Sequence, residues 1–448
     1  MNGKERGNWG SQFGFIAAAA GSAVGLGNIW RFPYITGQYG GAAFVLVYLL
    51  FVLLICIPIM NSELLIGRKS ERNAVGAFKV LAPGSPWWIV GAMGILAGFI
   101  ILSYYSVIAG WAVAFIFKSG AYMAAGADHA DIFVGSITSS VAPLIWHAIF
   151  MFMCIGIVAA GIEKGIEKYS KILMPMLILI LLVLIIRSVT LPGAGAGLSF
   201  YLKPDFSKLT AEGILAALGQ AFFSLSLGMG CMIVYGSYLK KDQDIPANSY
   251  WIAGTDTAIA FLAGFAIFPA VFAFGLEPGA GPGLTFITVP AVFASMGAIG
   301  HFFGILFFFL LTIAALTSAI SLLEVVSAYF IDEAKWNRKK AVWIMGIIIF
   351  LLGVPSSLGL GIWSNVKILG GRDILDSLDF LASNILLPLG GFLLCIFIGW
   401  FWGTNKAVEE GNIGAKGALT LGSGYRFLIK YVAPVAIFIV FLKSIGVF

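Results

Sequence analysis

The chain has 448 residues, of which 60% are hydrophobic and 11% are charged, and its mean hydropathy is +0.98. Soluble domains carry about 25% charged residues, so this composition excludes a water-soluble globule and predicts one polytopic membrane domain over residues 1–448. A net charge of +6 would suggest a nucleic-acid partner only in a soluble protein. Here we expect the lipid bilayer to be the partner of this surface and expect no binding of nucleic acid.

Cysteine and histidine residues are few and scattered. The four cysteines, Cys56, Cys154, Cys231 and Cys395, lie far apart inside apolar runs. This spacing supports neither a disulfide framework nor a zinc site. It also offers no nucleophile paired with a base, so we do not expect an enzyme.

Eleven apolar segments are long enough to cross a bilayer, which takes about 20 residues each. Bounded by charges, Pro or Gly, they are 11–36, 41–66, 88–117, 144–161, 167–188, 213–239, 248–275, 301–331, 340–357, 376–401 and 425–446. A cytoplasmic N-terminus places nineteen of the 27 basic residues inside and seven outside, with Arg31 in the first span. This split fits the positive-inside rule and puts the C-terminus outside. A cleaved signal peptide is the alternative for the first span, but its apolar run continues through Trp30 and Phe32.

The first and sixth segments share an unusual feature, because each contains closely spaced glycines beside polar residues. The first reads GSAVGLGNIWRFP from residue 21, and the sixth reads SLSLGMG from residue 224. Glycines at corresponding positions of two five-helix halves predict broken helices and a midplane binding site, as in inverted-repeat transporters. Close helix packing through GxxxG spacing, as at Gly21/Gly25 and Gly161/Gly165, is the alternative.

Unwound stretches leave backbone oxygens free where lipid supplies no water. Free carbonyls favour a hard cation, and half-helix N-termini favour a carboxylate. Asp256 lies inside a span with no basic residue near it in sequence, so a bound cation is its natural partner; a position near the cytoplasmic edge is the alternative. We expect Glu63 and Glu324 to satisfy backbone groups at the breaks. The hydroxyls of Thr317, Ser318 and Ser321 are weaker evidence, because such groups usually bond to a preceding carbonyl.

Several long motifs resemble the neurotransmitter:sodium symporter family, and within it the bacterial members that carry hydrophobic amino acids. They are GSAVGLGNIWRFPY (21–34), GGAAFVLVY (40–48), SLSLGMG (224–230), YGSYLKKDQD (235–244) and LTSAISLLEVVSAYFIDE (316–333). The resemblance implies an all-α, leucine-transporter-type fold of 11 transmembrane helices, with discontinuous helices 1 and 6. Two inverted repeats would occupy about 11–188 and 213–401, with an extra helix at about 425–446. It implies a multi-pass protein of a bacterial plasma membrane that moves neutral hydrophobic L-amino acids with two sodium ions by alternating access.

The resemblance also carries over binding residues. The first sodium ion would bind Ala23, Asn28, Ser224, Asp256 and the substrate carboxylate, and the second would bind Gly21, Val24, Ala314, Thr317 and Ser318. The amino acid would contact Ser22, Ala23, Leu26, Gly27, Ile101, Tyr105, Phe223, Ser224, Ser226, Met229, Ser318 and Leu322. Gly25 stands where monoamine carriers of this family have Asp, which leaves room for the substrate carboxylate. Met229 stands where an aromatic is common, and its flexible thioether favours broad specificity.

Gates and ion dependence follow from the same resemblance. Arg31 with Asp379 would form the outer gate, and Arg6 with Asp332, assisted by Tyr238, the inner gate. Gly165 and Pro175 would let the fifth span unwind toward the cytoplasm, with a simple kink as the alternative.

Ala260 and Asp256 predict chloride independence, because Asp256 itself supplies the negative charge that other members take from chloride or from a Glu at position 260. A passive channel would need a continuous polar pore, which these few ionisable groups cannot line. Proton-driven carriage remains open until uptake is measured without sodium.

Overall fold

The computed structural model describes residues 7–124, 126–276, 283–417 and 419–447, and every regular element in these ranges is a helix. Within them, nine helices are long and apolar enough to cross a membrane. A pair bent by 52° at a short break makes a tenth span. Two further helices on either side of a six-residue break supply the eleventh segment expected from the sequence.

The long segments follow the predicted spans closely. They are α1 (Gln12–Ala23) with η1 (Gly27–Arg31) and α2 (Phe32–Gln38); α3 (Ala42–Phe51) with η2 (Val52–Cys56) and α4 (Ile57–Ser70); α6 (Trp88–Phe117); α9 (Ala142–Ala159); η3 (Ile162–Glu167) with α10 (Lys168–Val189); α12 (Ala211–Ser224) and α13 (Cys231–Gly236); α14 (Ile245–Ala273); α16 (Ala298–Asp332); α17 (Arg338–Leu358); α18 (Ile374–Asp379), η6 (Phe380–Leu386), α19 (Leu387–Ile396) and η7 (Phe397–Trp402); and α21 (Ser423–Phe427), η8 (Leu428–Val432) and α22 (Ala433–Ser444).

Short helices connect these spans at the two ends of the molecule. They are α5 (Ala74–Leu81), α7 (Ser119–Tyr122), α8 (His129–Thr138), α11 (Ala194–Leu202), η4 (Phe206–Lys208), η5 (Leu284–Thr288), α15 (Val289–Ser295) and α20 (Thr404–Gly411). At one end, Arg68 of α4 is buried, donates to the carboxylate of Glu410 on α20, and also binds the carbonyls of Gln243 and Ile413. Buried guanidinium groups need such complete pairing, and here it joins the end of α4 to two connecting segments.

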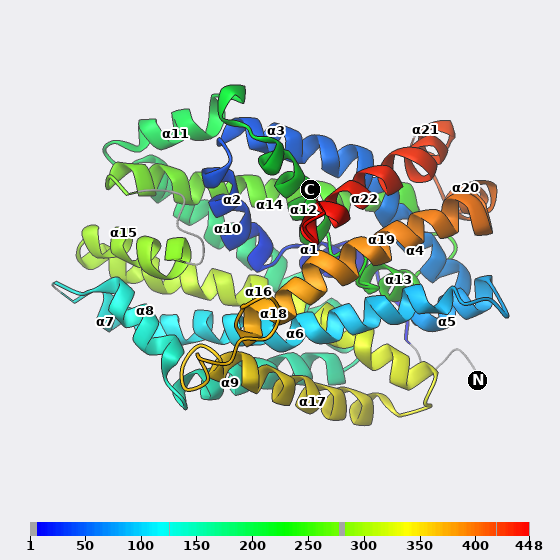
Figure 1. The fold of residues 1–448 in the computed structure, drawn as a ribbon, viewed down its shortest axis with the longest axis horizontal. Helices are drawn as coiled ribbons and strands as arrows, with labels where there is room; N and C mark the ends of the chain where they lie inside the picture. The colour runs from blue at the N-terminus through cyan, green and yellow to red at the C-terminus, as the bar shows by residue number, and fades with distance from the viewer. Residues whose placement is uncertain (1–6, 125, 277–282, 418, 448) are drawn as a thin grey trace.

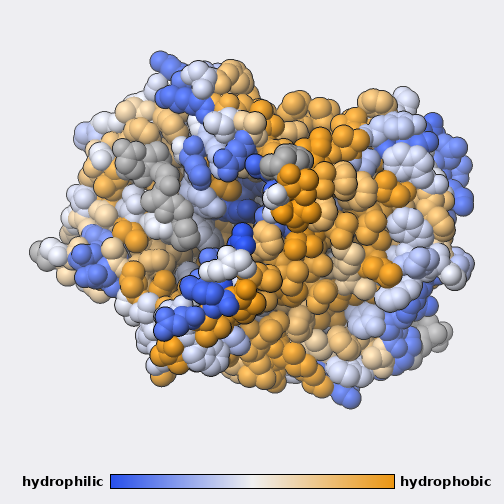
Figure 2. Space-filling model, in the orientation of Figure 1, coloured by the Kyte–Doolittle hydropathy of each residue, from blue (hydrophilic) through white to orange (hydrophobic). Residues whose placement is uncertain are grey.

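Helices α6 and α16 form the centre of the bundle, where they pack against each other (Figure 1). Their most apolar windows are 89% and 83% buried, whereas the window of α21–α22 is only 28% buried. Figure 2 shows apolar residues over the middle of the molecule and hydrophilic residues toward its ends and around a hollow. The apolar middle is the surface that a lipid bilayer covers.

Candidate functional site

The first broken span ends its first half at Ala23, and the chain leaves the helix at Val24 with ψ 104°. Three residues later it resumes as the π-helical turn η1, which continues into α2. Partners from other helices satisfy the freed backbone groups. The amide of Gln220 donates to the Gly27 carbonyl at 2.9 Å, and the Leu26 N–H donates to the Tyr105 hydroxyl at 3.1 Å. The predicted interruption is therefore present and is held open by tertiary contacts.

The second break lies between Ser224 and Cys231, and three of its residues adopt left-handed backbone conformations. They are Ser226 (φ 54°), Gly228 (φ 77°) and Gly230 (φ 75°). A Cβ on Gly228 would approach the Leu387 carbonyl oxygen to 2.7 Å, so glycine is needed there for space as well as for conformation. The Glu63 carboxylate accepts the Gly228 N–H at 2.7 Å. This confirms that Glu63 satisfies backbone groups at a break.

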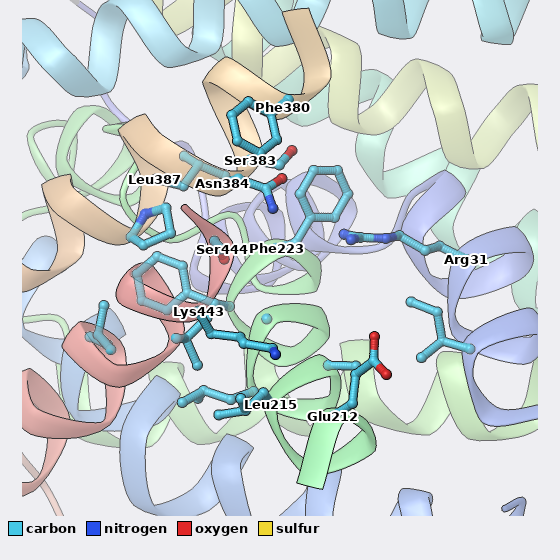
Figure 3. Close-up of a pocket in the computed structure, with 18 of the residues that line it drawn as sticks. Arg31, Glu212, Leu215, Phe223, Phe380, Ser383, Asn384, Leu387, Lys443 and Ser444 are labelled. Carbon is cyan, nitrogen blue, oxygen red and sulfur yellow. The ribbon is translucent and has the colours of Figure 1, made fainter. Parts of the chain in front are cut away.

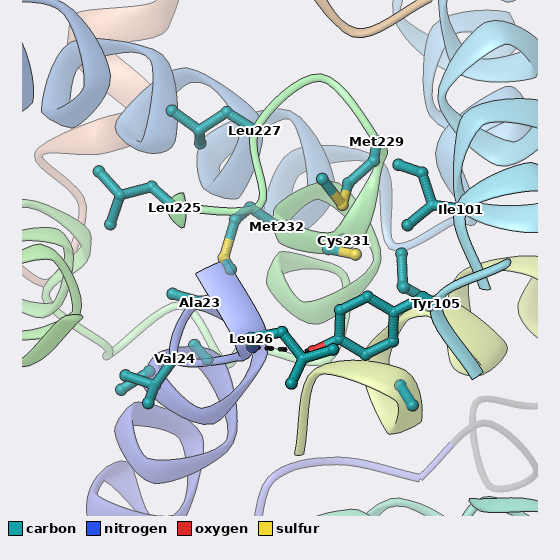
Figure 4. Close-up of a cluster of buried hydrophobic side chains, with 14 of the residues drawn as sticks. Ala23, Val24, Leu26, Ile101, Tyr105, Leu225, Leu227, Met229, Cys231 and Met232 are labelled. Atoms are coloured by element: carbon teal, nitrogen blue, oxygen red, sulfur yellow. Dashed lines mark hydrogen bonds between the residues drawn. The ribbon is translucent and has the colours of Figure 1, made fainter. Parts of the chain in front are cut away.

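A cavity of about 30 Å³ lies between the two breaks and is closed by α6 and α16. It is lined by Ser22, Ala23, Gly25, Gly27, Ile101, Tyr105, Phe223, Ser224, Ser226, Met229, Ser318 and Leu322. These include every residue expected around the amino acid except Leu26, which lines the larger outer space next to it. Figure 4 shows Tyr105 pointing its hydroxyl at Leu26 in the first break, with Ile101 and Met229 above the ring in this view.

One end of this cavity is polar and crowded around Gly25. A Cβ there would lie 2.4 Å from the Ser318 hydroxyl oxygen and 2.8 Å from the Tyr105 hydroxyl oxygen. Both hydroxyls therefore face the space that the missing side chain leaves. The other end is apolar, because Ile101, Met229 and Leu322 line it.

Five oxygen atoms converge where the first break meets α16. The Thr317 hydroxyl lies 3.3 Å from the Val24 carbonyl oxygen and 3.0 Å from that of Ala314. The Ser318 hydroxyl lies 3.2 Å from the Val24 carbonyl oxygen and 3.4 Å from that of Gly21. Such separations are close to those between neighbouring oxygens in a shell of about 2.3–2.6 Å radius around a hard cation the size of calcium. The five residues are those expected at the second sodium site.

Asp256 is fully buried in α14, away from either end of that helix. Its carboxylate accepts the Asn28 amide at 2.7 Å, the Ser224 hydroxyl at 3.0 Å and the Tyr48 hydroxyl at 3.5 Å. The alternative of a residue near the cytoplasmic edge is therefore wrong. Tyr48 was not expected here; it lies in the quoted motif GGAAFVLVY, but nothing in the sequence shows that α3 reaches α14.

The outer gate is arranged differently from the predicted ion pair. Among the described residues Arg31 forms no ion pair with Asp379; its guanidinium lies 4.9 Å from the centre of the Phe223 ring. Asp379 instead accepts the hydroxyls of Tyr104 (2.7 Å) and Ser383 (2.8 Å). Both charged residues line one space of about 460 Å³ above the central cavity. They border this space without closing it, because each is held by neutral neighbours.

A separate cavity of about 350 Å³ lies among α2, α12, η6 and α22. Figure 3 shows Lys443 and Glu212 pointing into it, with Arg31 and Phe223 at its border. Charges of both signs thus face a space between the broken helices and the peripheral helix α22.

The structure describes only part of the predicted inner gate. Arg6 lies outside the described residues, so the Arg6–Asp332 pair stays a prediction. Asp332 accepts the Asn73 backbone N–H at 2.8 Å. The next residue, Glu333, pairs with Lys79 at 2.9 Å; partial burial raises the pKa of Glu333, but hydrogen bonds from Lys79 and Asn73 bring it below its ordinary value. Contacts at this end therefore join α16 to α5 and the residues before it.

The expectation for Glu324 is wrong. Its carboxylate pairs with the Arg338 guanidinium at 2.7 Å and accepts the Tyr238 hydroxyl at 2.7 Å, and neither partner is a backbone group at a break. Arg338 begins the next helix, α17. No local pattern indicates this pairing, because it depends on how α16, α17 and the turn after α13 meet.

The fifth span begins with the π-helical η3, which contains Gly165, and Pro175 lies inside α10. Glu167 ties this region to the start of α1: it accepts the Gly10 N–H at 2.6 Å and the Ser11 hydroxyl at 2.9 Å. Ser11 itself caps α1. The start of the first broken span is thus anchored on an irregular turn of the fifth.

Comparisons with known proteins agree with this geometry. A sequence profile of the sodium:neurotransmitter symporter family matches residues 6–128 and 134–448. The chain belongs to this family. A sodium-dependent transporter of Bacillus subtilis, YhdH, is 41% identical over 98% of both chains, and one of Methanocaldococcus jannaschii is 33% identical over 100% of this chain and 92% of its own. The crystal structure of MhsT in complex with L-phenylalanine is 50% identical, with a TM-score of 0.90 over 98% of this chain and 100% of that chain.

The family profile and the match to MhsT confirm the family and the all-helical transporter fold that the motifs predicted. The protein is a sodium-dependent membrane transporter, and its family and fold are those of transporters and not of enzymes.

Proposed function

We propose that this protein couples the entry of two sodium ions to the uptake of one neutral hydrophobic L-amino acid, without chloride. The observation that carries the proposal is the central cavity itself. It has an apolar end, a polar end at two interrupted helices, and two clusters of oxygen ligands beside it. Free backbone oxygens at helix breaks are where transporters of this architecture bind ions and substrate.

The first sodium ion is assigned to Asp256, Asn28, Ser224 and the Ala23 carbonyl, together with the substrate carboxylate. The Asp256–Asn28 and Asp256–Ser224 hydrogen bonds support this set, because they already bring the side chains together. A substrate that completes the ion's shell makes the two affinities mutually dependent, which is the basis of coupling.

The second sodium ion is assigned to the five oxygens of Gly21, Val24, Ala314, Thr317 and Ser318. These belong to the first break and to α16, so an ion there joins α1 to the central helix. Neutral carbonyl and hydroxyl oxygens suit a hard cation and offer no soft ligand to a transition metal.

The substrate carboxylate is assigned to the polar end of the cavity, near Gly25 and the Tyr105 hydroxyl. The side chain then lies toward Ile101, Met229 and Leu322. MhsT was crystallised with L-phenylalanine, which supports a hydrophobic amino acid here. The cavity volume of about 30 Å³ is room for about two or three waters, since one water needs roughly 10–15 Å³ of such space. An amino acid with a hydrophobic side chain is larger, so binding must widen the cavity, and the flexible Met229 and partly exposed Phe223 are suited to move.

Chloride independence rests on Asp256 beside Ala260. Ala260 is buried one turn along the same helix and carries no charge. Asp256 therefore supplies the negative charge that balances the ion.

The same proposal includes two inverted repeats at about 11–188 and 213–401 and an extra helix at 425–446. It also includes a cytoplasmic N-terminus and a location in a bacterial plasma membrane. Arg31 with Asp379 and Arg6 with Asp332 and Tyr238 would form and break contacts as the two breaks tilt. Release to the cytoplasm would use Gly165 and Pro175.

Uptake into proteoliposomes tests the proposal. Radiolabelled leucine and tryptophan are offered under imposed sodium, proton and chloride gradients, with potassium replacing sodium at constant pH. Two sodium charges at 100 mV supply about 4.6 kcal/mol, or roughly a thousandfold accumulation before the sodium gradient is counted. Uptake that persists without sodium would overturn the coupling, and uptake that requires chloride would overturn the role of Asp256.

A further inference from the structure

Four small polar side chains join the two breaks to α16 behind the central cavity. Ser22 lies at the end of α1 beside the first break, Ser226 lies in the second break, Cys231 begins α13 directly after it, and Ser321 lies on α16. All four are buried, and Ser22 and Ser226 also line the cavity, whereas Ser321 and Cys231 stand behind it. Figure 4 shows Cys231 beside Met229, next to the cavity.

The hydrogen bonds among them can be followed proton by proton, because each hydroxyl or thiol donates once. Ser226 donates to the Ser22 carbonyl at 2.9 Å, and Ser321 donates to the Ser318 carbonyl at 2.7 Å. The Cys231 thiol lies 3.8 Å from the Ser321 oxygen.

One proton then remains, that of the Ser22 hydroxyl. Its near acceptors are the Ser321 oxygen at 2.7 Å, the Ser226 oxygen at 3.4 Å and the Cys231 sulfur, which is a weak acceptor. The bond to Ser321 has the usual O–H···O length, and the one to Ser226 is longer than usual. The Ser22 hydroxyl therefore donates to Ser321 and does not point its proton into the cavity.

We propose that Ser321 is a specificity-determining residue that acts through Ser22. By accepting the Ser22 proton it leaves Ser22 without a free donor at the cavity wall, so an apolar side chain can pack against this residue. Without Ser321, an apolar substrate would desolvate an unpaired hydroxyl, whereas a substrate with its own hydroxyl could accept that proton. This inference deepens the proposed function and rests on a hydrophobic amino acid binding in the central cavity.

The size of the effect follows from the asymmetry of buried hydrogen bonds. Leaving one partner unsatisfied weakens binding by roughly five- to a hundredfold, whereas removing both partners is nearly neutral. We expect Ser321→Ala to lose leucine affinity within this range and to lose much less affinity for threonine. Combining Ser22→Ala with Ser321→Ala removes both partners of the bond, so we expect the double variant to recover most of the leucine affinity.

The experiment measures leucine and threonine affinities of purified wild type, S321A, S22A, S22A/S321A and S327A at saturating sodium. Ser327 is the matched control, because it lies on the same helix and its buried hydroxyl has no hydrogen-bond partner among the described residues. We expect S327A to match wild type. A lower leucine-to-threonine affinity ratio in S321A, restored in the double variant, supports the inference.

Two results would overturn it. If S321A weakens leucine and threonine equally and the double variant recovers nothing, Ser321 serves only to hold Ser318 in place. If S321A matches S327A, the Ser22 donor is satisfied some other way. Both differ from failure of the proposed function, in which the wild type itself binds no hydrophobic amino acid.

Discussion

Replacing Gly25 by alanine adds one carbon at the point where substrate carboxylate and second sodium site are proposed to meet. The new Cβ would lie 2.4 Å from the Ser318 hydroxyl oxygen and 2.8 Å from the Tyr105 hydroxyl oxygen. Both hydroxyls must move. Ser318 then leaves the Val24 and Gly21 carbonyls, and Tyr105 leaves the Leu26 N–H.

The magnitude combines two costs. Overpacking a buried site costs about 1–3 kcal/mol, and the displaced hydrogen bonds cost about 1 kcal/mol more. A total of about 2–4 kcal/mol corresponds to roughly a 30- to 1,000-fold loss of affinity. Because Ser318 belongs to the proposed sodium ligands, we expect leucine affinity and sodium affinity to fall together.

The assay is equilibrium binding of labelled leucine to purified G25A over a sodium titration. G254A is the control, since a Cβ on Gly254 meets nothing within 4 Å and the residue also lies in a membrane helix. Wild-type affinity of G25A for both ligands would refute the placement of the carboxylate and of the ion.

Three further changes test other parts of the site. Asp256→Asn removes the proposed charge beside the first ion, so we expect sodium affinity in uptake assays to fall about tenfold or more and added chloride to restore part of it. Met229→Phe replaces a flexible side chain by a rigid one, so competition binding is expected to show tryptophan losing several-fold more affinity than leucine. Glu167→Ala removes the acceptor of the Gly10 N–H, so hydrogen–deuterium exchange at the start of α1 is expected to rise severalfold.

Each of these has a contrary result. Normal transport by D256N without any chloride effect would remove the reason for chloride independence. An unchanged tryptophan-to-leucine ratio in M229F would show that another residue sets the width of the cavity. Glu163 is exposed on the same turn as Glu167, so E163A is the control for E167A, and equal exchange in both would show that Glu167 does not hold α1.

Local patterns in the sequence determined much of this protein. Long apolar runs predicted the spans, because a helix must satisfy its own backbone in lipid, and α6 begins and ends at the predicted residues 88 and 117. Paired glycines predicted both breaks, because they weaken a helix wherever they occur. The motifs around 21–34 and 316–333 identified the family, and the resemblance to that family supplied the residues proposed for the site.

Only the tertiary structure decided which side chains meet across the bundle. Tyr48 donates a hydrogen bond to Asp256, Arg338 forms an ion pair with Glu324, and Ser321 accepts the Ser22 hydroxyl. No local pattern in the sequence predicts that the helices carrying these pairs are in contact. Arg31 stacks on Phe223 where an ion pair with Asp379 was expected. A charge or hydroxyl in the sequence shows that a partner is needed, but helix packing selects which partner lies within hydrogen-bond distance.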